Sequence, residues 1–66
     1  MKIGELVLIN SAHQTSIEKL LGRSLKQNEK FVIKDIYTEY GEVLINISSF
    51  DNQFLEQVAE SSVTEA

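Results

Sequence analysis

The chain lacks cysteine, and this absence excludes both disulfides and thiolate ligands for a metal ion. A zinc site built from this chain alone is excluded too, because His13 is its only imidazole. Glycine is scarce, and Gly4, Gly22 and Gly41 are too dispersed to form a phosphate-cradling loop. We therefore expect no metal ion and no cofactor.

Long apolar runs are also missing. No run approaches the roughly 20 residues of a membrane span, and the apolar part of MKIGELVLIN is too short for a signal peptide. These absences predict a soluble, cytoplasmic protein that has no contact with a membrane. The 66 residues are enough for one small domain, which buries only about 60% of its unfolded surface. That size leaves no room for an ordinary catalytic cleft, so we expect no enzyme, and the lack of disulfides favours a homodimer.

The residues from Phe31 to Ser48, FVIKDIYTEYGEVLINIS, predict a β-hairpin. They form two runs rich in β-branched and aromatic residues, joined by a glycine-containing turn. In the second run Val43, Ile45 and Ile47 occupy every second position, so they place one apolar row on the core side of the strand.

The first run of the hairpin is less regular. Phe31 and Ile33 share one phase, whereas Ile36 falls in the other. A β-bulge near Lys34 and Asp35 would shift the register by one residue and explain the change.

Two turns are compatible with this hairpin. A two-residue turn at Tyr40-Gly41 pairs Ile36 with Ile45. A three-residue turn instead places Asp35 opposite Ile45, which requires the bulge to keep a carboxylate out of the core. We favour the two-residue turn, or the three-residue turn combined with the bulge.

The residues before the hairpin predict a strand and a short helix. Residues 1–10 are mostly apolar and predict a first strand that is largely covered on both faces. Thr15 or Ser16 can cap a helix that ends at Gly22, and a longer helix reaching about Glu29 is the alternative. The apolar residues with helical spacing are Ile17, Leu20 and Leu21.

The residues after the hairpin allow two interpretations. Phe50, Phe54 and Val58 have the spacing of an amphipathic helix. The alternative is a helical turn around residues 51–53, followed by a closing strand over residues 54–58. The last eight residues, AESSVTEA, have little apolar content, so residues 59–66 are predicted to be a frayed acidic tail on a domain of residues 1–58.

This order resembles a small SH3-like β-barrel of the kind found in phage-encoded and transcription-associated proteins. The resemblance rests on IGELVLIN as the opening strand, FVIKDIYTEYGEVLINIS as the central hairpin and FLEQV as the closing strand. It implies a mainly β (α+β) fold, with one short helix after the first strand. The alternative architecture is a three-stranded sheet packed by two helices.

Basic residues are confined to the first half of the chain. Residues 1–34 carry six basic and three acidic side chains, whereas residues 35–66 carry seven acidic side chains and no basic one. Such asymmetry is typical either of a solubilising surface or of an acidic surface that binds a basic partner. We favour the second explanation, with partner-binding residues Asp35, Glu39, Tyr40, Glu42, Asp51, Glu56 and Glu60.

An acidic surface of this kind can imitate the phosphates of DNA. The leading hypothesis is therefore a non-catalytic interaction module for a basic protein, in its sharpest form a phage-type nucleic-acid mimic that inhibits a host DNA-binding protein. Such a protein would not itself bind nucleic acid. The alternative is a nucleic-acid-binding or assembly-adaptor barrel that acts through the basic residues Lys19, Arg23, Lys26 and Lys30.

Overall fold

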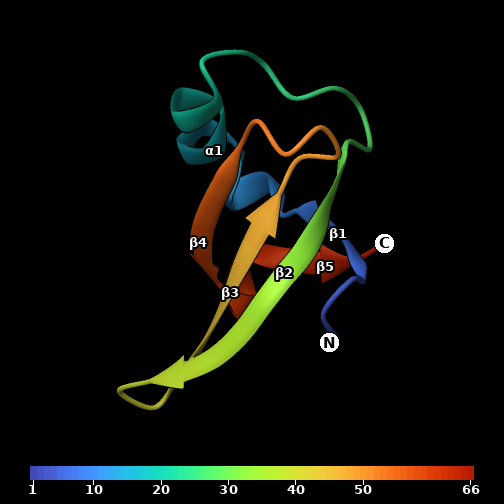
Figure 1. Ribbon diagram of the computed structural model, residues 1–66. Coiled ribbons are helices and arrows are strands. Elements are labelled where there is room, and N and C mark those ends of the chain that lie inside the picture. The colour runs from blue at the N-terminus through green and yellow to red at the C-terminus, as the bar shows by residue number, and fades with distance from the viewer.

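A computed structural model describes residues 1–66 and shows a mainly β fold with one α-helix (Figure 1). The helix lies between the first and second strands, and a 3-10 helix precedes both the α-helix and the last strand. The elements are β1 (Leu6–Ile9), η1 (Ser11–His13), α1 (Gln14–Leu21), β2 (Lys30–Glu39), β3 (Glu42–Ser48), β4 (Leu55–Ala59), η2 (Glu60–Ser62) and β5 (Val63–Glu65).

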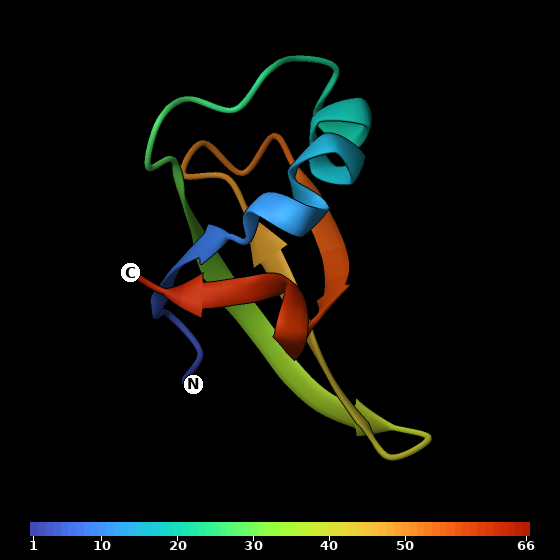
Figure 2. The same cartoon turned by 180° about the vertical axis from the view of Figure 1, so that it is seen from behind.

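The five strands form one antiparallel sheet in the order β4-β3-β2-β1-β5. The sheet does not close, so β4 and β5 are its two edges. The β2–β3 hairpin extends away from the body, and α1 with the two longest loops lies at the other end (Figures 1 and 2). The predicted alternative of three strands and two helices is therefore wrong. No helix of the protein has the length and apolarity needed to cross a membrane.

The hairpin has the predicted two-residue turn. Ile36 lies opposite Ile45, and the register shifts between Ile33 and Asp35, which confirms the predicted bulge. The bulge lets both halves of β2 turn apolar side chains inward, since Phe31 and Ile33 are buried before it and Ile36 packs on the core after it.

Seven side chains make up the buried core. Strands β1, β2 and β3 and the helix supply six of them, and β5 supplies the seventh. The rings of Phe31 and Phe54 also make an edge-to-face contact, with centroids 5.8 Å apart, that joins β2 to the residue before β4. The core residues are Val7, Ile17, Phe31, Ile33, Ile45, Ile47 and Val63.

The helix ends where the sequence predicts but begins earlier. Gly22 has φ 77° and donates its N–H to the Glu18 carbonyl at 2.9 Å, so the short helix is confirmed and the longer one is wrong. Neither Thr15 nor Ser16 caps it. Both lie inside the first turn, because η1 runs directly into α1 and leaves His13 at the cap position without a side-chain cap.

Strand β1 is shorter and less covered than predicted. The chain turns at Gly4, which has φ 91° and donates its N–H to the Ile33 carbonyl at 2.7 Å. The strand therefore begins only at Leu6, whose side chain is exposed, and a single residue of β1, Val7, is fully buried.

The C-terminal residues correct a further prediction. Residues 55–59 form a closing strand, which confirms the strand alternative for this segment and not the helix, whereas the residues expected to fray form η2 and β5. Val63 pairs with Ile9 of β1 and is only 6% exposed, and the Asn10 amide donates to the Ser61 carbonyl at 2.8 Å. Backbone pairing to β1 and one buried valine fix this segment, so the folded unit continues to Glu65.

Candidate functional site

The end of the β2–β3 hairpin gathers part of the predicted acidic set. Glu39 and Glu42 lie directly opposite one another on the two strands. Between them Tyr40 has φ 50° and Gly41 has φ 78°, as a tight two-residue hairpin turn requires. Tyr40 is 97% exposed, so its ring packs on nothing and is free to contact a partner.

Glu60 joins this group from the far side of β3. Ala59 pairs with Leu44 close to the hairpin end, and the next residue, Glu60, lines a shallow depression of about 290 Å³ together with Glu42. Three of the six predicted carboxylates, those of Glu39, Glu42 and Glu60, therefore lie together.

The other three predicted carboxylates lie apart from the hairpin end. Asp35 follows the bulge and accepts the Ile36 N–H at 2.9 Å. Glu56 lies within β4 and accepts the Gln57 N–H at 3.0 Å. Asp51 lies in the β3–β4 loop at the opposite end of β3 (Figure 1). The seven predicted partner-binding residues are thus divided among four places: the hairpin end, the bulge of β2, strand β4 and the β3–β4 loop.

None of these six carboxylates has a counter-ion within the chain. One of the two ion pairs uses Glu65, and the other joins Arg23 to Glu29 at 2.7 Å. The acids of this set other than Asp51, which lines the same cleft as Arg23, therefore keep their charge for solvent or for a partner.

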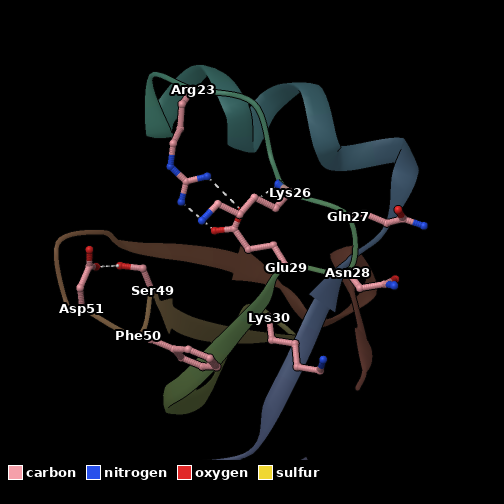
Figure 3. Close-up of a pocket in the computed structure, with 9 residues that line it drawn as sticks. All are labelled: Arg23, Lys26, Gln27, Asn28, Glu29, Lys30, Ser49, Phe50 and Asp51. Carbon is pink, nitrogen blue, oxygen red and sulfur yellow. Dashed lines mark hydrogen bonds and ion pairs between the residues drawn. The ribbon is translucent and has the colours of Figure 1, made fainter.

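An open cleft of about 400 Å³ lies at the end of the molecule opposite the hairpin (Figure 3). The α1–β2 loop forms one wall and the β3–β4 loop forms the other. The residues that line it are Arg23, Lys26, Gln27, Asn28, Glu29, Lys30, Ser49, Phe50 and Asp51.

The Glu29 carboxylate organises the first wall. It accepts two bonds from the Arg23 guanidinium, at 2.9 and 2.7 Å, and one from the Lys26 N–H at 2.9 Å. These donors, with the Arg23 hydrogen bonds foremost, lower the pKa of Glu29 to about 2, and the same contact raises the pKa of Arg23. The Glu18 carboxylate adds a further anchor by accepting the Leu25 N–H at 2.6 Å. The loop is therefore held by two carboxylates.

Ser49 and Asp51 organise the second wall. The Ser49 hydroxyl donates to Asp51 at 2.6 Å and accepts the Phe54 N–H at 3.1 Å, and the Gln53 N–H donates to Asp51 at 3.0 Å. The Ser49 hydroxyl and then the Gln53 N–H lower the pKa of Asp51. This network fixes the loop and leaves Phe50 on its outside, 64% exposed.

The predicted basic set is partly brought together in this cleft. Arg23, Lys26 and Lys30 line it, whereas Lys19 lies on α1 away from it. The three do not share a helical face, as the longer helix would require, because the loop that follows Leu21 gathers them instead. Glu29 neutralises Arg23, so Lys26 and Lys30 supply the free positive charge.

Phe50 is the cleft residue that the sequence interpretation missed. Its helical spacing with Phe54 and Val58 predicts a position on the apolar face of a helix, where a phenylalanine would be buried. Its neighbours Ser48, Ser49, Asp51 and Asn52 are turn formers, and that composition was the available signal for an exposed loop aromatic.

A second groove, of about 410 Å³, separates α1 from β4. His13, Ser16 and Glu56 are among its lining residues, but no hydrogen bond joins their side chains. No three His, Asp or Glu side chains lie close enough to hold a metal ion. The arrangement offers an apolar wall beside a strand edge rather than a catalytic constellation.

Comparison with known proteins adds no assignment: no protein-family model, curated protein or solved structure matches the chain.

Proposed function

We propose that this protein is a non-catalytic interaction module whose acidic hairpin end binds a basic partner protein. One observation carries the proposal: Glu39 and Glu42 lie opposite one another without a counter-ion, beside an aromatic ring that is 97% exposed. Like charges at directly opposed positions of a hairpin destabilise it by up to about 1 kcal/mol. The fold gains nothing from this arrangement, whereas a basic partner would relieve the repulsion and bury the ring.

The hairpin end also suits long-range attraction. Glu60 adds a third carboxylate, and residues 35–66 contain no lysine or arginine that would cancel the field. A cluster of one sign raises the association rate of an oppositely charged partner. Imitation of nucleic-acid phosphates to inhibit a DNA-binding protein is the more specific form of this proposal, and the acids of β4 and η2 support it by extending the set along the sheet edge.

The SH3-like assignment is the finer form of the fold proposal. Its support is a meander of four strands whose fifth strand returns to pair with the first, and a long β2 that the bulge bends. Bulges bend strands and allow a small sheet to curl toward a barrel.

The test compares Glu39→Lys/Glu42→Lys with Glu5→Lys/Glu65→Lys. Both double variants change the net charge equally, but only the first pair lies at the hairpin end. Each protein is immobilised, exposed to nuclease-treated cell lysate, and its bound proteins are identified and then remeasured in purified form. We expect a basic protein to bind the wild type and the control, and the hairpin variant to lose most of its association rate. Equal binding by both variants would contradict the proposal.

A second candidate function, binding of single-stranded nucleic acid, is favoured by the composition of the cleft. The exposed ring of Phe50 is a surface on which a base can stack, and Lys26 and Lys30 are ammonium groups free of ion pairs for phosphates. Asn28 and Gln27 add amides beside them (Figure 3). Both walls are held by their own hydrogen bonds, so binding would cost little conformational entropy in these loops.

Fluorescence polarisation with a labelled single-stranded oligonucleotide tests this candidate. Phe50→Ala and Lys26→Ala should weaken binding, whereas Lys19→Ala, which removes the same charge outside the cleft, should not. Equal loss in the two lysine variants would indicate non-specific attraction and would reject the cleft as the site.

A further inference from the structure

Strand β4 is an edge of the sheet, and its hydrogen bonds establish which backbone groups face outward. Phe54 and Ser49 are bonded across the loop, since the Ser49 N–H donates to the Phe54 carbonyl at 3.1 Å. Bonded pairs alternate along an antiparallel ladder, so Glu56 and Val58 bond to β3. Gln57 then faces the free edge, and its N–H is indeed taken by a side chain, the Glu56 carboxylate at 3.0 Å.

This edge lacks several of the usual protections against strand addition. Native edges are blunted by proline, lysine, bulges or a covering segment. The sequence of β4, LEQVA, contains neither proline nor lysine, and its pairing with β3 is regular from Leu55 to Ala59. The outward N–H of Gln57 is covered only by the carboxylate of the neighbouring Glu56, which a carbonyl of an added strand would replace.

An apolar wall lies beside the same edge. The groove between β4 and α1 is lined by Ile17 and Leu20 of the helix and by Glu56, Gln57 and Val58 of the strand. Ile17 is buried in the core, but Leu20 is 57% exposed toward a groove of about 410 Å³. Figure 2 shows α1 close to the end of β4 where the strand begins. A chain added to the edge could therefore contact Leu20 with a side chain.

The acidic charge beside the groove favours a basic segment as the bound chain. Glu56 has no ion-pair partner, and no lysine or arginine lines the groove. Beyond Ala59 the edge leads to Glu60 at the acidic hairpin end. A second copy of this chain is a poor occupant, because β4 and β5 each carry an acid and no base, so pairing two edges would bring acids together without a cation to pair with them.

We propose that the free edge of β4 binds an extended basic segment of the partner protein as an added β-strand. The added strand accepts the Gln57 N–H, places a cation on the released Glu56 carboxylate and packs an apolar side chain on Leu20. This inference rests on the proposed function and specifies how the basic partner is held.

The probe is a fluorescein-labelled peptide of Lys-Lys-Val-Val repeats, which places a cation and an apolar residue on each face of a strand. A peptide with glutamate in place of lysine is its control. Gln57→Pro deletes the outward N–H at an edge position where proline is tolerated, whereas Gln57→Ala keeps that N–H. We expect Gln57→Pro to weaken binding at least about tenfold with an unchanged thermal melt, and Gln57→Ala to bind like the wild type.

Amide hydrogen exchange on the wild-type protein provides a measurement that does not depend on the folding of a variant. The lysine peptide should slow exchange at Leu55, Gln57 and Ala59, the outward positions of β4. Failure of the wild type to bind the lysine peptide, equal binding by Gln57→Pro, or slowed exchange only at the hairpin end or β5 would overturn the inference. Slowed exchange at β4 without peptide, rising with protein concentration, would identify a second copy as the occupant and would also overturn it.

Failure of this inference is distinguishable from failure of the proposed function. If Gln57→Pro retains the basic partner while Glu39→Lys/Glu42→Lys loses it, the edge is not used and the hairpin proposal stands. If the wild type retains neither a basic protein nor the peptide, both are wrong.

Discussion

Replacing Glu29 with glutamine removes a charge while keeping the size of the side chain, so it isolates the electrostatic part of the contact with Arg23. In the native protein the Glu29 carboxylate accepts both guanidinium bonds and the Lys26 N–H. A neutral amide at this position accepts fewer bonds and offers no charge to the guanidinium. The α1–β2 wall of the cleft should therefore be less strongly held in Glu29→Gln.

The magnitude follows from the pKa of Glu29, which is about 2 in the folded chain against an ordinary value of 4.5. At roughly 1.4 kcal/mol per pKa unit, that lowering corresponds to an upper bound of about 3 kcal/mol. The Glu29 side chain is 15% exposed, but the Arg23 side chain is 45% exposed, so water screens the pair. We expect Glu29→Gln to lower the free energy of unfolding at pH 7 by about 1–2 kcal/mol.

The pH dependence of unfolding provides a separate check that ionised Glu29 stabilises the folded state. Because the folded-state pKa of Glu29 lies below the unfolded-state value, its contribution is complete above about pH 5 and is lost as the pH falls toward 2. Urea unfolding followed by circular dichroism should show a difference between wild type and Glu29→Gln that is largest at pH 7 and vanishes near pH 2. A difference that is absent at pH 7, or that does not change with pH, would refute the reasoning.

A double-mutant cycle with Arg23→Gln separates the ion pair from other effects of substitution. If the pair carries the effect, Glu29→Gln and Arg23→Gln together should cost less than the two single costs added, because both remove the same contact. Additive costs would mean that Glu29 acts through the Lys26 N–H and not through Arg23.

Three further substitutions test the fold. Ile45→Asp should unfold the domain, because the residue is completely buried in mid-strand and an unpaired buried carboxylate costs more than about 4 kcal/mol; a melt within a few degrees of the wild type would place Ile45 outside the core. A chain that ends at Ala59 should lose at least about 2 kcal/mol, because it lacks the buried Val63 and the pairing to β1, and an unchanged urea midpoint would mean that β5 is dispensable. Gly22→Ala should cost about 1 kcal/mol from the positive φ alone, since no atom crowds the added methyl, and a stabilised variant would show that the helix end can rearrange.

Local patterns predicted the central hairpin because its determinants lie within a few residues. The two-residue period identifies β3, the change of phase identifies the bulge, and Gly41 supplies one of the two positive φ values of the turn. The end of α1 at Gly22 could be predicted in the same way, because the left-handed conformation that ends the helix depends on that one residue being glycine.

The C-terminal strand could not be predicted in this way. Val63 is the only large apolar residue after Val58, so a window of local composition indicates a frayed tail. Its partner is Ile9, near the other end of the chain, and backbone pairing to β1 does not depend on the side chains of β5. Such a strand is visible only once the sheet order is known.

The cleft could not be predicted from the sequence for a similar reason. Its walls are two loops separated in sequence by β2 and β3, and only the fold brings Phe50 and Asp51 opposite Arg23 and Lys26. Three of the four predicted basic residues, Arg23, Lys26 and Lys30, line the cleft, but the sequence prediction attached them to a longer helix that Gly22 prevents.

The fold also changes what the charge asymmetry means for recognition. In sequence the basic and acidic halves are separate, but in space Asp51 of the acidic half lies in the cleft with Arg23, and that guanidinium helps to lower the Asp51 pKa. The negative potential available to a partner therefore comes from the hairpin end and the β4 edge, where no cation lies nearby. Reversing Asp51 should consequently disturb the cleft more than it disturbs binding of a basic protein. Reversing Glu39, Glu42 or Glu60 should do the opposite, because those carboxylates have no partner within the chain.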